Sequence, residues 1–211
     1  MKYESFELFK VIGAGTSSVP IPENYRDCIT LLKSDYSRVY GKTASLFVIW
    51  LTSIRNHCIK YLFWMRLSAY RRGWLYLICK LRQEHYGKKF CLDIPPTTKI
   101  GYGFYIGHGF SIVVNTTAVI GNNVNLSQGV TIGSNSGHAA WIGDNVYIGP
   151  NTCVVEDVHI GSNTLIGAGS VVTKSIEGNC TAVGVPCHVI GENRHPEYIH
   201  NRWNMDSIHD S

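Results

Sequence analysis

The sequence lacks the features of a secreted or membrane-spanning chain. Its seven cysteines are an odd number and form no CxxC pair, which argues against a disulfide framework or a zinc knuckle and favours a reducing compartment. The first ten residues, MKYESFELFK, carry two glutamates and no apolar core of a signal peptide. The longest uncharged apolar run, residues 43–54, is too short to cross a bilayer. We therefore expect a soluble, cytoplasmic protein.

Acidic residues are nearly absent from one part of the chain. Between Arg38 and Lys89 there are eleven Lys and Arg residues and a single acid, Glu84, and this segment is rich in Leu, Ile, Trp and Tyr at helical spacing. The pattern predicts helices over 43–69 and 73–86. A basic, aromatic surface could bind an anionic polymer or a membrane, but we favour helices packed on a core, with Lys and Arg stems covering apolar surface. We predict no nucleic-acid partner, and we leave membrane contact open without predicting it.

The segment after Pro95-Pro96 has a different character, because aliphatic residues recur in it at intervals of six. The aliphatic positions are Ile100, Ile106, Val114, Ile120, Leu126, Ile132, Ile142, Ile148, Val154, Ile160, Ile166 and Val172. Six residues per strand and turn, with one aliphatic side chain pointing inward, describe a triangular β-solenoid with about 18 residues per coil. Twelve such units predict about four coils.

The six-residue spacing slips twice, between Ile106 and Val114 and between Ile132 and Ile142. The chain must leave the solenoid wall at these two places. His108 lies in the first slip and His138 in the second. Loops on a rigid scaffold often carry the chemistry of a protein, so both histidines are candidate functional residues.

The pattern resembles the left-handed parallel β-helix of the hexapeptide-repeat acyltransferases. It is most similar to serine O-acetyltransferases and their relatives encoded with capsule and other surface-polysaccharide genes. The resemblance rests on the segments DIPP (93–96), IGH (106–108), QGVTIG (128–133), IGAGSVV (166–172) and GVP (184–186). It predicts a mainly β fold, with a helical region over 1–92, the β-helix over 93–191 and a C-terminal tail over 192–211.

Transfer of an acetyl group to a hydroxyl needs a base that removes the hydroxyl proton, and a histidine suits this role at neutral pH. We predict that His108 is this base. Asp93 lies 15 residues earlier, close to one coil below at the same corner, where a carboxylate could orient the imidazole. The alternative for Asp93 is a capping role at the start of the solenoid.

The resemblance implies further site residues. His138 matches a second family histidine that helps to hold the acceptor, and Asp35 matches an acidic residue that contacts it. The acetyl donor in the family is acetyl-CoA, which lies in a groove between neighbouring subunits. By position, Ser134, Pro150, Ala168 and Gly169 would line this groove, and Lys174 would meet the nucleotide phosphates. The groove requires two walls, so the resemblance also implies a homotrimer or a dimer of trimers.

Two residues depart from the serine acetyltransferase pattern. Gly107 replaces an aspartate that binds the ammonium group of serine, and Gly137 replaces an arginine suited to its carboxylate. From these losses we predict an O-acetyltransferase that acts on a sugar of a surface polysaccharide or its precursor, an acceptor that could be anionic.

Three alternatives stay open beside this prediction. The first is a serine O-acetyltransferase, and the second is a non-catalytic structural solenoid. The third, a carbonic anhydrase on the same scaffold, would need three zinc-binding histidines. The solenoid contains no H-x4-H pair, so we predict no metal site.

Overall fold

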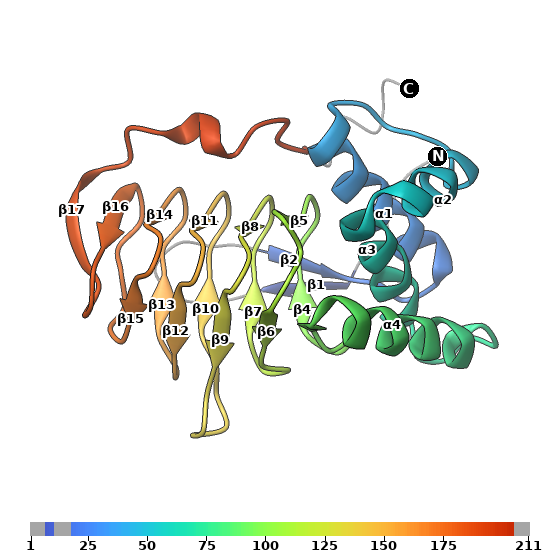
Figure 1. The fold of residues 1–211 in the computed structure, drawn as a ribbon, viewed down its shortest axis with the longest axis horizontal. Coiled ribbons are helices and arrows are strands. Elements are labelled where there is room, and N and C mark those ends of the chain that lie inside the picture. The colour runs from blue at the N-terminus through green and yellow to red at the C-terminus, as the bar shows by residue number, and fades with distance from the viewer. Residues whose placement is uncertain (1–6, 11–17, 205–211) are drawn as a thin grey trace.

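The computed structural model describes residues 7–10 and 18–204, and it has a helical end and a solenoid (Figure 1). The helices are α1 (Tyr25–Tyr40), α2 (Leu46–Arg55), α3 (His57–Ser68) and α4 (Tyr76–Phe90). The helices predicted over 43–69 and 73–86 are present, and the first segment contains two of them, because Asn56 adopts an extended backbone between α2 and α3. The Asn56 amide donates to the Thr52 carbonyl, and its side chain accepts a hydrogen bond from the Ile59 amide.

The solenoid has three faces of parallel strands, as the repeat predicts. Face 1 contains β4 (Lys99–Ile100), β7 (Val119–Ile120), β10 (Trp141–Ile142) and β13 (His159–Ile160). Face 2 contains β5 (Tyr105–Ile106), β8 (Asn125–Leu126), β11 (Tyr147–Ile148), β14 (Leu165–Ile166), β16 (Cys180–Val183) and the antiparallel β17 (His188–Glu192). Face 3 contains β3 (Leu92–Asp93), β6 (Ile112–Val114), β9 (Thr131–Gly133), β12 (Cys153–Val155) and β15 (Val171–Val172).

All twelve aliphatic residues of the repeat are buried in the solenoid core. On each face they stack in register, as Ile120 pairs with Ile142, and Ile142 with Ile160. The predicted parallel β-solenoid with an N-terminal helical region is therefore confirmed, and the hexapeptide repeat makes it a left-handed helix. The slips at 107–111 and 134–140 leave the wall as expected, and the second forms the loop that projects beyond the coils (Figure 1).

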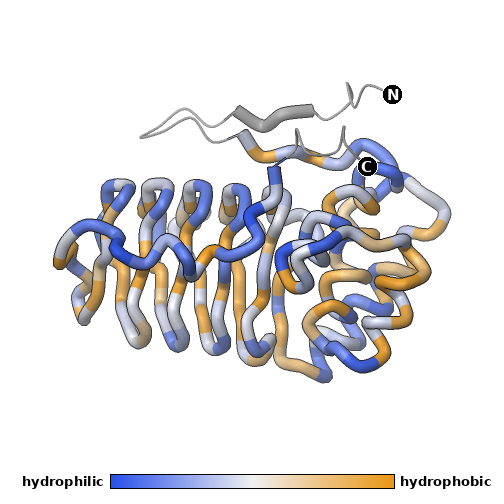
Figure 2. The backbone as a smooth tube through the Cα atoms, turned by 90° about the horizontal axis from the view of Figure 1, so that it is seen from above, coloured by the Kyte–Doolittle hydropathy of each residue, from blue (hydrophilic) through white to orange (hydrophobic). Residues whose placement is uncertain are grey.

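Two further segments, which the repeat does not predict, run along the solenoid. The hairpin of β1 (Glu7–Lys10) and β2 (Ser18–Ile21) lies beside β4, where the Asn122 side-chain amide donates to the Ser18 carbonyl. After β17, residues 193–204 return along the coils to the helical end as a largely hydrophilic strap, which includes the short 3-10 helix Pro196–Tyr198 (Figure 2). The division of the chain at 92 and 191 remains a prediction, and residues 205–211 of the predicted tail lie outside the described part.

The strap is tied to the coils by asparagines. The Asn125 side chain donates to the Tyr198 carbonyl, and Asn123 exchanges two hydrogen bonds with the backbone of Trp203. Buried Arg38 of α1 then joins the strap, the first coil and the second coil, because its guanidinium donates to the carbonyls of His200 and Gly103 and to the Asn125 side chain.

A buried ion pair joins the helices to the first coil. Asp35 of α1 accepts two hydrogen bonds from Arg66 of α3, at 2.7 and 2.9 Å, and a third from the Phe104 amide at 2.8 Å. Arg66 also donates to the carbonyls of Ile100 and Gly101. Both side chains are almost completely buried, so each charge depends on the other for its compensation.

No helix within 18–204 is long and apolar enough to span a bilayer. All seven cysteines lie within these residues, and none of them forms a disulfide.

Replacement of Asp35 by Asn should lower the free energy of unfolding by about 3–5 kcal/mol, because it leaves the Arg66 guanidinium buried without a counter-charge. Urea denaturation followed by circular dichroism measures this loss. The matched control is Glu84→Gln, which removes the exposed pair of Lys80 and Glu84 at 3.6 Å and should change stability by less than about 1 kcal/mol. Equal, small effects of the two substitutions would contradict the importance of the buried pair.

Candidate active site

The predicted site residues lie along two corners of the triangular solenoid. We call the turns between faces 2 and 3 the His108 corner; they comprise residues 107–111, 127–130, 149–152 and 167–170. We call the turns between faces 3 and 1 the His138 corner; they comprise residues 94–98, 115–118, 134–140, 156–158 and 173–175. The two corners form opposite edges of face 3.

His108 is exposed and has a left-handed backbone, with φ of 52°. The start of α3 packs against the residues that follow it. The Gly109 amide donates to the Cys58 sulfur at 3.3 Å, and the ring centroids of His57 and Phe110 are 4.7 Å apart. A Cβ atom at position 109 would lie only 3.0 Å from that sulfur, so glycine allows this close approach. The helical end therefore positions the His108 turn.

His57 is a second histidine at this corner, and neither the repeat nor the family segments identify it. Partial burial, with the nearby His108 and Lys60, lowers the pKa of His57. Lowering the pKa favours the neutral imidazole at pH 7, which can donate or accept a hydrogen bond beside the predicted base. Residues 57 and 108 are far apart in sequence, and only the docking of α3 on the first coil brings them together.

Asp93 is exposed at the end of β3, in register with Val113 of the next coil, so it lies on face 3 and not, as predicted, at the corner that carries His108. Among the described residues, no hydrogen bond or ion pair joins Asp93 to His108. Asp93 instead borders two depressions, a cavity of about 630 Å³ beneath α4 and a groove of about 610 Å³ along face 3.

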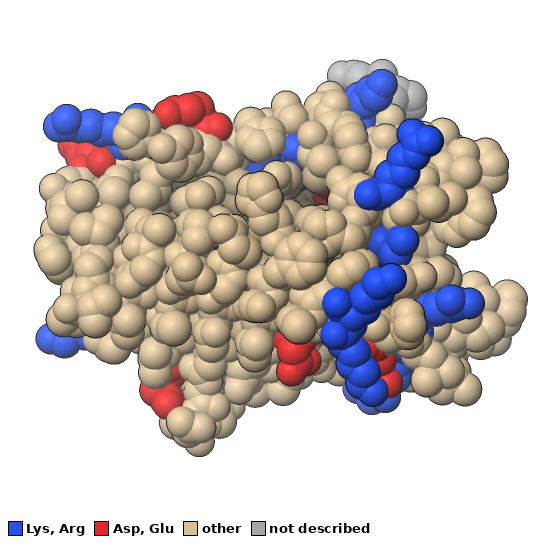
Figure 3. All heavy atoms as spheres, viewed as in Figure 1, with Lys and Arg blue, Asp and Glu red and all other residues tan. Residues whose placement is uncertain are grey.

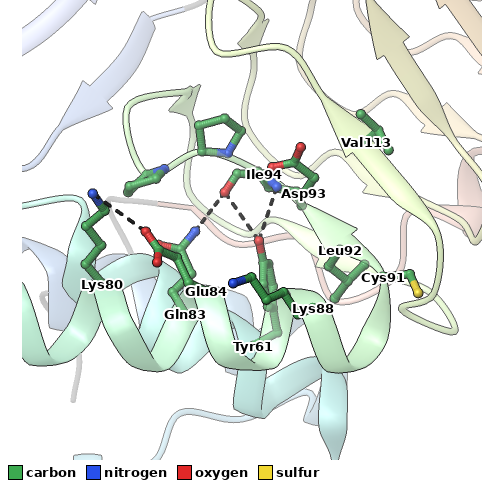
Figure 4. Close-up of a pocket in the computed structure, with 13 residues that line it drawn as sticks. Tyr61, Lys80, Gln83, Glu84, Lys88, Cys91, Leu92, Asp93, Ile94 and Val113 are labelled. Atoms are coloured by element: carbon green, nitrogen blue, oxygen red, sulfur yellow. Dashed lines mark hydrogen bonds and ion pairs between the residues drawn. The ribbon is translucent and has the colours of Figure 1, made fainter.

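The cavity beneath α4 contains charges of both signs (Figure 4). Lys80, Glu84 and Lys88 line it from α4, and Asp93 lies on the side formed by β3. Lys80 pairs with Glu84, so Lys88 and Asp93 are the charged side chains of the lining that form no ion pair within the described residues. A small molecule with an ammonium and a carboxylate group would find complementary charges here.

The groove on face 3 extends from Asp93 to Ser134 and Glu156 at the His138 corner. Glu156 anchors the projecting loop, because its carboxylate accepts hydrogen bonds from the hydroxyls of Ser134 and Ser136 at 2.8 and 2.6 Å and from the amides of Asn135 and Ser136. These bonds lower the pKa of Glu156 to about 2. His138 is exposed within this loop, and Gly137 beside it has φ of +90°.

The predicted acetyl-CoA residues are divided between the two corners. Pro150, Ala168 and Gly169 lie at the His108 corner, where the Gly169 amide donates to the Pro150 carbonyl at 2.8 Å. Ser134 and the exposed Lys174 lie at the His138 corner, across face 3. A groove between two copies of the chain could be lined by one corner from each copy, whereas one copy does not bring all five residues together.

Asp35 requires a correction. It was predicted to contact the acceptor, but its side chain is completely buried and both its oxygens accept hydrogen bonds from Arg66. Its position joins α1 to α3 and to the first coil, so no oxygen of Asp35 faces the cavity or the groove.

The comparisons with known proteins agree with this architecture. A family model described as bacterial transferase hexapeptide (six repeats) matches residues 139–174. The mitochondrial serine acetyltransferase 3 of Arabidopsis thaliana is 38% identical over 125 residues, which are 57% of this chain and 32% of that protein. The chain spans less than half the length of the curated relatives it matches.

Solved structures extend the similarity into the helical end. The serine acetyltransferase of Brucella abortus strain S19 superposes with a TM-score of 0.67 and 28% identity, over 79% of this chain and 70% of that one. A serine acetyltransferase in complex with CoA superposes with a TM-score of 0.65 and 26% identity, over 78% of this chain and 70% of that one. The chain thus combines a hexapeptide-repeat transferase fold with a specific similarity to serine acetyltransferases.

The prediction of a surface-polysaccharide acceptor is wrong in light of these similarities, because the relatives and the solved structures are serine acetyltransferases. The prediction rested on the missing charges at Gly107 and Gly137. Two other charged residues, Lys88 and Asp93, line one cavity from different elements, and the sequence does not show that they lie together.

The Glu156 anchor leads to a prediction about pH. A pKa lowered from 4.5 to about 2 means that the carboxylate contributes fully above pH 4.5, and that this contribution declines as pH falls from 4.5 and is lost as pH falls through about 2. Exchange protection of the Asn135 and Ser136 amides, measured by mass spectrometry and corrected for intrinsic rates, should be equal at about pH 6 and pH 8 and should decrease progressively below pH 4.5. Glu156→Ala should remove this protection, whereas Asp157→Ala, its exposed neighbour, should retain it. Protection that is already completely lost at pH 4.5 would contradict the anchor.

Proposed function

We propose that the protein is an acetyl-CoA-dependent serine O-acetyltransferase. The observation that carries this proposal is the similarity to serine acetyltransferases, which includes both the solenoid and the helical end. The cavity beneath α4 supports it, since Asp93 and Lys88 offer one charge of each sign to a zwitterionic acceptor. In this proposal they replace the charges that Gly107 and Gly137 do not supply.

His108 acts as the general base in the proposed reaction. It takes the proton of the serine hydroxyl as the oxygen attacks the thioester carbonyl and the C–O bond forms. The C–S bond then breaks, and the protonated His108 gives its proton to the departing sulfur, so CoA leaves as the thiol. Asp93 orients the His108 imidazole or binds the ammonium group of serine. The neutral His57 at the same corner donates or accepts a hydrogen bond without adding charge.

The proposed donor site lies between copies of the chain. Pro150, Ala168 and Gly169 of one copy and Ser134 and Lys174 of its neighbour would line it, because these groups occupy opposite edges of face 3. A cyclic trimer satisfies this requirement for every copy at once. His138 would then approach the site of the neighbouring copy.

The proposal is tested by thiol release from acetyl-CoA with L-serine as the varied substrate. Release should saturate with serine, and His108→Ala should lower kcat by about 10²–10⁴ while the affinity for acetyl-CoA, measured by calorimetry, stays nearly unchanged. Asp93→Asn should lower turnover by a similar or smaller factor. The control is His195→Ala, an exposed histidine of the strap. Thiol release that does not depend on serine, or survives His108→Ala, would overturn the proposal.

A second substitution tests the acceptor cavity. Lys88→Ala should raise the KM for L-serine by about tenfold or more, because it removes the proposed partner of the carboxylate. The same variant should leave the KM for L-serine methyl ester nearly unchanged. Lys89→Ala is the matched control, since Lys89 is also exposed on α4 but does not line the cavity. Equal shifts for serine and its ester would place the acceptor elsewhere.

A further inference from the structure

Helix α2 exposes most of its apolar residues. Phe47, Trp50, Leu51 and Ile54 follow the spacing i, i+3, i+4, i+7, so they form one stripe along the helix. The Phe47 side chain is 66% exposed, and only Ile49 and Ser53 of this helix are buried. The expectation that these helices pack their apolar residues on a core therefore fails for α2.

A second stripe with the same spacing begins in the turn before α4 and continues along the first two turns of this helix. Trp74, Leu77, Ile78 and Leu81 are all exposed, and Trp74 reaches 83%. Both stripes contain a tryptophan, whose amphipathic ring is suited to a boundary between water and an apolar phase. Neither stripe is explained by packing within the chain.

Contacts through α3 connect the two helices that carry the stripes. Lys60 of α3 donates to the Ile54 carbonyl at the end of α2, and its ammonium lies 5.5 Å from the centroid of the Tyr86 ring on α4. Arg82, one turn after Ile78 on α4, lies over the ring of Trp64 on α3. We call the two stripes together the apolar helix surface; it comprises Phe47, Trp50, Leu51, Ile54, Trp74, Leu77, Ile78 and Leu81.

The charges around the apolar helix surface are nearly all positive. Lys and Arg side chains gather over the helical end, whereas the visible part of the solenoid is largely uncharged (Figure 3). Exposed bases on or next to α2 and α4 are Lys42, Arg55, Arg71, Arg72, Arg82, Lys88 and Lys89. The single exposed acid between Arg38 and Lys89 is Glu84, and Lys80 already pairs with it.

An exposed apolar surface with basic residues around it distinguishes between two kinds of partner, a second copy of the chain and an anionic lipid surface. A second copy that packed symmetrically on this surface would place bases opposite bases without acids to compensate them. An anionic lipid surface instead attracts the bases and accepts the aromatic and aliphatic side chains at the boundary of its headgroups and acyl chains. We propose that the apolar helix surface binds the surface of a bilayer that contains anionic lipids, with α2 and the start of α4 lying in the interface.

Vesicle co-sedimentation of the whole chain tests this proposal. The protein should sediment with vesicles of phosphatidylcholine and phosphatidylglycerol and bind at least about tenfold more weakly to phosphatidylcholine alone. Binding should weaken as salt rises from about 0.1 M to about 1 M, because the Debye length falls from about 10 Å to about 3 Å. Tryptophan emission should shift to shorter wavelength when the vesicles bind.

Substitutions within the stripes test the surface itself. Phe47→Ser with Trp50→Ser, and Leu77→Ser with Leu81→Ser, should each reduce binding by about tenfold or more. The matched control is Val189→Ser with Ile190→Ser, two exposed aliphatic residues of β17 at the other end of the molecule. Circular dichroism of each variant verifies that it is folded.

Three outcomes would overturn the proposal. The first is equal binding to charged and uncharged vesicles, and the second is binding that the stripe variants do not change. The third is a decrease in the molar mass of the stripe variants by light scattering without vesicles, which would identify a second copy of the chain as the partner. Thiol-release activity with soluble substrates is measured in parallel, so a failure here is distinguishable from a failure of the proposed acetyl transfer.

Discussion

The constraint on which the structure depends is the stacking of one aliphatic side chain per face on its equivalent in the next coil. Ile120, Ile142 and Ile160 illustrate it on face 1. Each coil is too small to form a core alone, so its stability comes from burial against its neighbours. This requirement keeps the walls straight and the turns in columns, which is why residues separated by one coil, such as Pro150 and Gly169, become neighbours.

The helical end is joined to the solenoid by a buried ion pair and its hydrogen bonds, and not by stacked aliphatic side chains. A solenoid coil exposes backbone groups at its end, and here the carbonyls of Ile100 and Gly101 and the Phe104 amide are covered by Arg66 and Asp35. The ion pair compensates two buried charges and at the same time satisfies these backbone groups. It also holds α3 against the first coil, where His57 and Cys58 at the start of the helix contact the turn that carries His108.

The stacking of the coils and the docking of the helical end together position the groups that the proposed reaction uses on and around face 3. The rigid corner presents His108, and the α4 junction forms the cavity that contains Lys88 and Asp93. The other corner carries the loop that Glu156 anchors. The rigid coils therefore position the reacting groups. The helical end carries the exposed stripes, which are available for contact with a surface outside the molecule.

The sequence by itself determined the solenoid, its coils and its two slips, because a period of six is a local pattern that every coil repeats. It also identified His108, His138 and Asp93 as candidates, since the slips and the family segments are visible without coordinates. Only the tertiary structure decided that Asp35 is a buried structural residue, that His57 lies beside the His108 turn and that Lys88 faces a cavity with Asp93. It alone showed that the stripes of α2 and α4 remain exposed. These properties depend on contacts between residues far apart in the chain, and helical periodicity looks the same whether an apolar stripe meets a core or the solvent.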